Sequence, residues 1–165
     1  MEDRFNEIYD RHRDAVEAYA RRRVPADLVD DVVAETFLVC WRKLGIMPAE
    51  PLPWLYAVAR NTIANQRRSA ARTAAVPWEL AAGEPEPAGD PQLAAAFARL
   101  SDRDREVLRL VAWEGLSLAQ ASTVLGCTTV SCRVRFHRAK RRLAALLETS
   151  TAGASARPHP EGAIR

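Results

Sequence analysis

The sequence lacks the features of a disulfide-stabilised protein, of a structural zinc site and of a membrane-spanning segment. Its 165 residues contain only three cysteines, Cys40, Cys127 and Cys132, and no C-x-x-C pair. An odd number at these spacings argues against a disulfide scaffold and a structural zinc site. No apolar run approaches the roughly 18 to 20 residues of a membrane span. The charged N-terminus predicts no secretory signal, so we expect a cytoplasmic protein without membrane insertion.

Candidates for catalysis are also scarce. The chain has three histidines, His12, His137 and His159, and no paired metal-ligand motif, P-loop or nucleophile elbow. We therefore predict that the protein is not an enzyme and that it uses no metal and no other cofactor.

Signals for β-structure are missing as well, and the apolar residues instead recur at steps of three and four. This pattern predicts an all-α fold of two small helical domains, residues 1–73 and 93–148. Proline, glycine and acidic residues are concentrated in 74–92, which predicts a flexible linker. Residues 149–165 contain few large apolar side chains, so we expect a disordered tail.

The small net charge of +3 hides a basic patch in the third predicted helix, from about Trp54 to Arg72. Its polar and basic members are Arg60, Asn61, Asn65, Gln66, Arg67, Arg68 and Arg72. Trp54 and Tyr56 lie at its N-terminal end, and aromatic rings beside arginines suit single-stranded DNA, whose unstacked bases need a ring surface. The alternative is that these two rings only pack the domain.

The second predicted domain has the order of a helix-turn-helix. Ser117 and Gln120 have the spacing of a capping box at the start of a short helix. Gly126 breaks the chain, and Thr128 or the residue after it caps a longer, basic final helix. A short helix, a tight glycine turn and a longer basic helix together favour duplex DNA binding.

A helical wheel divides the final helix into an inner and an outer side. The inner sector holds Cys132, Phe136, Ala139 and Leu143. The outer sector holds Val130, Val134, His137, Arg138 and Arg141, with Arg133, Arg135, Lys140 and Arg142 on its flanks. A solvated basic side is the plain alternative, but guanidinium groups on a second helix match phosphates and guanine edges.

Three segments, in order, resemble the extracytoplasmic-function (ECF) sigma factors, the minimal sigma-70 type with regions two and four only. DLVDDVVAETFLVCWRKL resembles region 2.2, and PWLYAVARNTIANQRRSAAR resembles regions 2.3 and 2.4. LSDRDREVLRLVAWEGLSLAQASTVLGC, followed by RVRFHRAKRRL, resembles region four. The resemblance implies a subunit that brings core RNA polymerase to a promoter, recognising the −35 element as duplex and the −10 element as single strand.

The resemblance also implies partners and contacts. The partners are promoter DNA, the β′ clamp helices and β flap of core polymerase and, in many relatives, an anti-sigma factor. The candidate contacts with core polymerase are Asp31, Glu35, Leu38 and Trp41. The candidate −10 contacts are Trp54, Tyr56, Arg60, Asn61, Asn65, Arg67 and Arg68, after a loop at 45–53 that matches the loop receiving a flipped base. The candidate −35 contacts are Thr129, Arg133, Val134, Arg135, His137, Arg138 and Arg141.

Two positions of the recognition helix depart from the family pattern. Val130 stands where a glycine is usual, and Val134 replaces a polar serine on the outer side. We expect an atypical −35 sequence, with Val134 in apolar contact with a group such as a thymine methyl. The competing function is a stand-alone helix-turn-helix regulator that binds palindromic duplex as a dimer, which leaves the segment from Trp54 to Arg72 unexplained.

Overall fold

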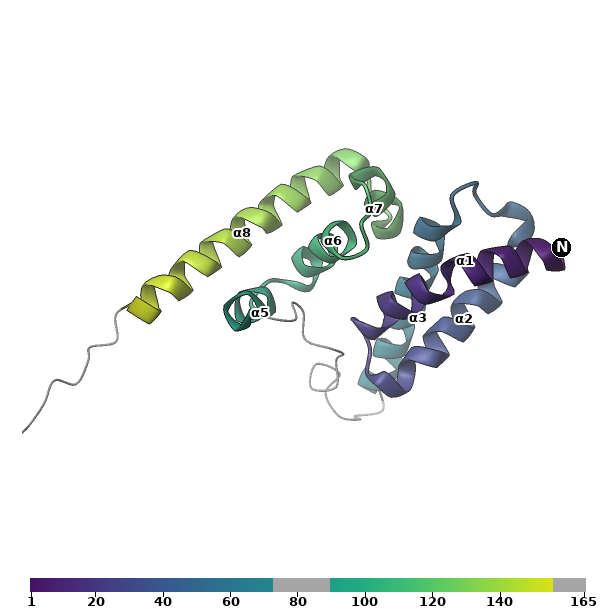
Figure 1. Cartoon of the computed structure of the whole chain (residues 1–165), viewed down its shortest axis with the longest axis horizontal. Helices are drawn as coiled ribbons and strands as arrows, with labels where there is room; N and C mark the ends of the chain where they lie inside the picture. Colours follow the sequence, from purple (N-terminus) through teal and green to yellow (C-terminus); the bar gives the residue numbers. More distant parts are fainter. Residues whose placement is uncertain (73–89, 156–165) are drawn as a thin grey trace, which may run out of the picture.

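The computed structural model describes residues 1–72 and 90–155, and these two ranges contain helices and turns but no strand. The all-α prediction is therefore confirmed. Most of the predicted linker, 74–92, lies outside the described residues, as do residues 156–165 of the predicted tail. The two described ranges form an N-terminal bundle and a C-terminal unit that lie side by side (Figure 1).

The N-terminal bundle consists of α1 (Glu2–Arg21), α2 (Val29–Arg42) and α3 (Pro51–Arg72). Short 3-10 turns, Ala26–Leu28 and Leu44–Ile46, precede α2 and follow it. Asp27 lies in the first of these turns, and Leu28 is the N-terminal cap residue of α2. Helix α3 begins at Pro51, earlier than the predicted Trp54, because a helix tolerates proline in its first turn, where the missing N–H has no intrahelical partner.

The C-terminal unit consists of α5 (Pro91–Ala98), α6 (Asp102–Ala112), α7 (Leu118–Leu125) and α8 (Thr129–Ser155). The capping box of Ser117 and Gln120 is present, and Gly126 ends α7 with φ of 63°. The Thr128 hydroxyl accepts from the Ser131 backbone N–H at 3.1 Å, so Thr128 caps α8. Helix α5 starts at Pro91, inside the predicted linker, and α8 continues past position 148, where the domain was expected to end.

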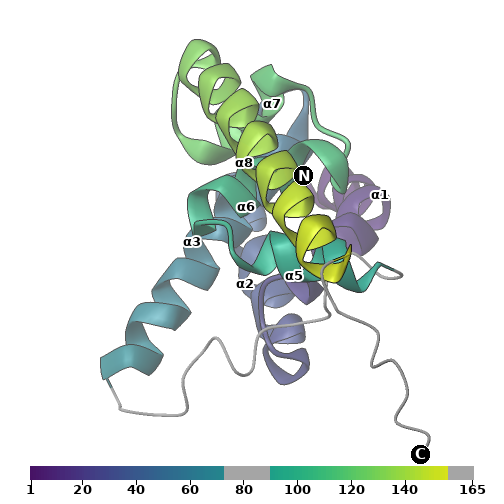
Figure 2. The same ribbon diagram turned by 90° about the vertical axis from the view of Figure 1, so that its left-hand side faces the viewer.

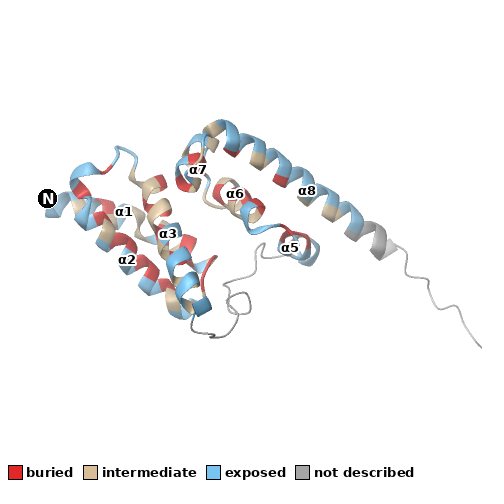
Figure 3. Ribbon diagram, turned by 180° about the vertical axis from the view of Figure 1, so that it is seen from behind, coloured by how far each residue is buried: buried red, intermediate tan, exposed pale blue. Residues whose placement is uncertain are grey.

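The buried apolar residues of the two halves form one continuous cluster, and they follow the inner sides of the helices (Figure 3). Val16, Val32 and Leu55, one from each helix of the N-terminal bundle, are fully buried. In the C-terminal unit, Val107 of α6 and Cys132 of α8 are also fully buried. Helix α7 packs against α3, so the buried residues of the two halves are continuous.

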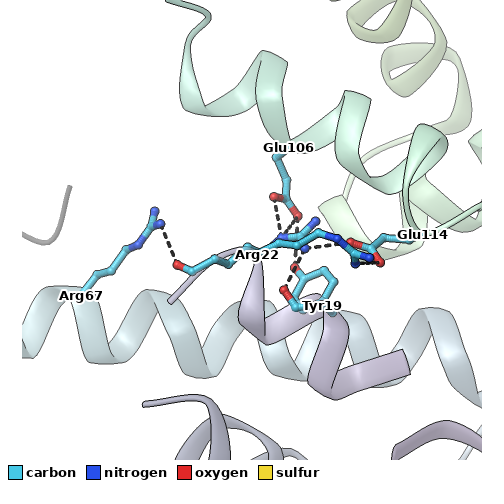
Figure 4. Close-up of polar contacts among 6 residues, drawn as sticks. Tyr19, Arg22, Arg67, Glu106 and Glu114 are labelled. Carbon is cyan, nitrogen blue, oxygen red and sulfur yellow. Dashed lines mark hydrogen bonds and ion pairs between the residues drawn. The ribbon is translucent and has the colours of Figure 1, made fainter. Parts of the chain in front are cut away.

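A cluster of ion pairs joins the halves, and we call it the Arg23 network (Figure 4). Arg23 follows α1 and is only 4% exposed. Its Nε lies 3.0 Å from a carboxylate oxygen of Glu106, and its Nη1 lies 2.8 Å from one of Glu114. Arg22 contacts the other Glu114 oxygen at 2.9 Å, and the Tyr19 hydroxyl donates to Glu106 at 3.1 Å. The Arg23 guanidinium also lies 3.6 Å over the Tyr19 ring.

The charges of the Arg23 network sustain one another. Burial lowers the pKa of Arg23, but its neighbours Tyr19, Glu106 and Glu114 raise that pKa overall, so the guanidinium stays charged. Burial raises the pKa of Glu106, but the Arg23 charge outweighs this effect and holds the pKa below its usual 4.5. Burial, followed by the Glu106 charge, raises the pKa of Tyr19 well above its usual value, so its hydroxyl remains a donor.

Arg23→Leu is expected to lower the free energy of unfolding by about 3 to 5 kcal/mol, because it leaves the Glu106 carboxylate buried without its cation. Urea unfolding of the full chain measures this loss. Arg21→Ala is the control, since the Arg21 side chain is 54% exposed and pairs with Glu17 on the surface of α1. It should cost less than about 1 kcal/mol. Similar losses in the two variants would contradict a special role for Arg23.

The same network predicts an acid-sensitive fold. A carboxyl whose pKa is depressed by folding contributes stability above its unfolded pKa and loses it as the pH falls through the folded value. For Glu106 the loss begins below its ordinary pKa of 4.5. The melting temperature should therefore fall between about pH 5 and pH 3, and Glu106→Gln should flatten this part of the curve. Circular dichroism melts test it, and parallel curves for both proteins would refute the assignment.

Candidate nucleic-acid interface

The outer side of α8 presents most of the residues predicted to contact duplex DNA. The exposed members of that set are Arg133, Val134, His137, Arg138 and Arg141. Thr129 and Arg135 are half-buried, and the Thr129 hydroxyl lies 3.3 Å from the Ser122 hydroxyl of α7. This contact connects the first turn of α8 to the helix before it, which fixes where the outer side faces.

The inner side of α8 is held by α6 and α7. Cys132 and Ala139 are fully buried, as the helical wheel predicts. Farther along, Arg142 pairs with Asp104 of α6 at 2.5 Å, and the Asp104 side chain is only 5% exposed. Ser101 caps α6 by accepting from the Asp104 backbone N–H at 3.2 Å. Arg142 therefore anchors α8 to α6.

A second polar surface lies on α3, whose C-terminal half projects beyond the other helices (Figure 2). Its exposed members are Arg60, Asn61, Asn65, Arg68 and Arg72. Trp54 is half-buried and packs against the core of the bundle. Arg67 is also half-buried, and its guanidinium donates to the Arg23 carbonyl oxygen at 3.4 Å (Figure 4). Arg67 therefore supports the end of α1 as well as belonging to this surface.

Tyr56 does not belong to the α3 surface, and here the prediction is corrected. The residue is 2% exposed, and its ring stacks on that of Tyr19 with centroids 4.8 Å apart and planes 18° apart. Burial raises the pKa of Tyr56 to about 12. Because its side chain points toward α1, its ring is not available to a nucleic-acid base. The alternative reading, that this aromatic packs the domain, is the correct one for Tyr56.

A third surface lies on α2, where acidic and apolar side chains share one side. Asp31 and Glu35 are exposed, as are Leu38 (42%) and Trp41 (43%). The Trp41 and Phe5 rings form a T-shaped pair with centroids 5.1 Å apart, so Trp41 packs against α1 on one side and remains exposed on the other. All four residues predicted to contact a protein partner are thus accessible together.

The sequence did not reveal the residues that hold the two halves together. The run Arg21–Arg23 and the acids Glu106 and Glu114 carried no motif, and only the clustering of three arginines at the end of a helix could have drawn notice. Within the described ranges, no group of three or more metal-ligating side chains comes together. Every helix in the same ranges is too short or too polar to cross a membrane.

The two halves match two parts of one protein class. Residues 8–73 match Sigma-70 region 2, and residues 91–143 match Sigma-70 region 4. The chain is 32% identical over 154 residues to the ECF RNA polymerase sigma factor SigL of Mycobacterium tuberculosis, which covers 86% of this chain and 87% of SigL. It is 30% identical over 168 residues to the RNA polymerase sigma factor CnrH of Cupriavidus metallidurans, covering 89% and 88% of the two chains.

Solved structures agree with these relatives. CnrH in complex with the cytosolic domain of CnrY superposes with a TM-score of 0.63 and 31% identity over 88% of each chain. The sigma factor RpoE of Bartonella quintana, in complex with the anti-sigma factor NepR, shares the fold with a TM-score of 0.70, covering 90% of this chain and 98% of RpoE. The chain therefore belongs to the sigma-70 class. Within that class it is an ECF sigma factor, a protein that binds RNA polymerase and confers promoter specificity.

Proposed function

We propose that the three surfaces divide the work of transcription initiation among them. The outer side of α8 binds the −35 element as duplex, α3 binds the −10 element as single strand, and the α2 surface docks on the β′ clamp helices of core polymerase. Residues 1–73 and 93–148 act as the two binding units and 74–92 as their connection. The observation that carries the proposal is that one chain presents two exposed basic helices and a separate acidic and apolar surface.

The side chains on α8 suit duplex recognition. Arginines neutralise phosphates and donate two hydrogen bonds to a guanine edge, while the N-terminal turns of a recognition helix contact bases in the major groove. Arg133, Arg138 and Arg141 are exposed, and the sequence contains no acidic residue from Gly115 to Leu147. The positive potential of this side is therefore not cancelled along the helix.

The α3 surface suits a strand that has left the duplex. Trp54 offers part of a ring, and Asn61 and Asn65 offer amide groups that are able to bond base edges. When unstacked bases bind here, the free energy of that binding drives the opening of the DNA, and no nucleotide is hydrolysed. We therefore propose a non-enzymatic role, performed in the cytoplasm, where polymerase and chromosome are found.

We also propose an anti-sigma protein as a regulator of this chain. The solved relative RpoE is bound to the anti-sigma factor NepR, and CnrH is bound to the cytosolic domain of CnrY. The α2 surface, with Leu38 and Trp41 exposed, is a suitable docking area for such a protein, because exposed apolar side chains next to charged ones mark interfaces. Its occupation would exclude core polymerase.

Transcription in vitro tests the proposed function. The purified chain, with bacterial core polymerase and a library of random promoter templates, should yield promoter-dependent transcripts that neither protein gives alone. Glu35→Lys should weaken core binding about tenfold by reversing a charge on the α2 surface. Asp14→Lys, whose native side chain is 94% exposed on α1, is the matched control and should leave binding unchanged. Absence of any promoter-dependent transcript would refute the function.

Arg138→Ala is expected to weaken binding of the −35 duplex and to change its salt dependence. A cation that neutralises one phosphate adds about 0.9 to the slope of log K against log salt, so the variant should show a slope smaller by this amount. Fluorescence anisotropy of the holoenzyme on a −35 duplex measures both quantities. Arg99→Ala, on the exposed end of α5, is the control. Unchanged affinity and slope for Arg138→Ala would remove that residue from the interface.

A further inference from the structure

Two large apolar side chains stand on the outer side of α8, where charge otherwise dominates. Val130 is 69% exposed and Val134 is 44% exposed. They are one helical turn apart, so both lie on the same side. Among the C-terminal residues whose side chains the structure describes, 90–149, no other large hydrophobic residue is exposed to this degree.

Neither valine contributes to holding the helix in place. The side of α8 that packs on α6 and α7 carries Cys132 and Ala139, which are fully buried. β-Branched residues are also poorer helix formers than the alanine or arginine that an exposed position accepts at no cost. Two such residues on the exposed surface therefore have no explanation in the stability of the fold, and an exposed apolar pair marks a contact with something else.

The surroundings of the valines indicate the chemistry of that contact. Both line an open hollow between α8 and the start of α6, together with Arg135, Arg138 and Ser101. Asp104 also lines this hollow, but its carboxylate pairs with Arg142 and its side chain is only 5% exposed. A surface that combines cations with exposed methyl groups fits a polyanion that exposes apolar groups.

The major groove of DNA is such a partner. Among the base edges in this groove, thymine alone presents a methyl group, while guanine presents two acceptors that arginine binds. Val130 lies in the first turn of α8 and Val134 in the second, which are the turns that reach base edges in a helix-turn-helix. A polyanion suits this patch better than a protein partner, because Arg133, Arg138 and Arg141 are exposed on the same helix and the sequence has no acid from Gly115 to Leu147 to balance them.

We propose that Val130 and Val134 are specificity-determining residues that read thymine methyl groups in the −35 element, beside positions read by arginine. This inference rests on the proposed function of α8. It predicts a −35 sequence with thymine at one or two defined positions, where cytosine or uracil is rejected because the methyl group, and not the hydrogen-bonding pattern alone, is recognised.

Removal of single methyl groups from the DNA tests the proposal. The −35 sequence is first selected from a random duplex library by the full chain bound to core polymerase. Each thymine is then replaced singly by deoxyuridine, which changes only the methyl group. Replacement at the positions facing the valines should weaken binding about threefold to fivefold per methyl. Thymines outside the selected element serve as the internal control and should show no effect.

Substitutions of the two valines test the same contact from the side of the protein. Val134→Ser removes both side-chain methyl groups, so it should bind the thymine and deoxyuridine duplexes equally well. Val134→Thr keeps one methyl group and should show an intermediate preference, and Val130→Ser should lose the preference at a neighbouring position. Melting temperatures close to the wild-type value would show that the exposed substitutions leave the fold intact.

Other outcomes are separable. Equal binding of deoxyuridine at every position of the element would overturn the proposal and leave promoter-dependent transcription untouched. A loss in Val134→Ser of the same size on thymine and deoxyuridine duplexes would overturn it too, and would indicate that the valine contacts a protein subunit. Failure of the wild-type chain to direct any transcription would instead refute the function on which the inference rests.

Discussion

A guanidinium removed from water needs carboxylates around it, and in this chain that need joins the two halves. Arg23 is 4% exposed, and the acids that hold it come from the other half of the molecule. Replacing both acids would leave the Arg23 guanidinium buried without an anion. With α6 fixed near the end of α1, α7 lies against α3, and the basic side of α8 is left facing solvent.

The same arrangement shows how a net charge of only +3 is compatible with two exposed basic surfaces. Glu106 and Glu114 form ion pairs within the Arg23 network, and Asp104 forms an ion pair with Arg142. Most other acids of the N-terminal half lie on α1 and α2, whereas α3 and α8 up to Leu147 carry none. The acids that balance the total therefore do not shield the basic sides of α3 and α8, and the distribution of charge is more informative than its sum.

Local signals in the sequence predicted much of the fold, and contacts between distant segments were beyond them. The capping box at Ser117 and the left-handed Gly126 depend on a few neighbouring residues, and both were found as expected. Tyr56 was misplaced because an aromatic residue at the start of a basic helix suits either a core or a base, and the decision depends on Tyr19 in another helix. Likewise, the acids that pair with Arg23 lie 83 and 91 positions away in the sequence. Helical periodicity shows which side of its own helix such a residue occupies, but it does not show which residue of another helix it contacts.

The exposed valines of α8 have a consequence for how such a factor diverges. Because the outer side of the helix carries no packing, its residues are free to change at little expense in folding free energy. After gene duplication, a copy is thus able to acquire a new promoter preference through a few substitutions on this side while Cys132 and Ala139 preserve the scaffold. Residues proposed to set the promoter preference and residues that hold the fold thus lie on opposite sides of a single helix.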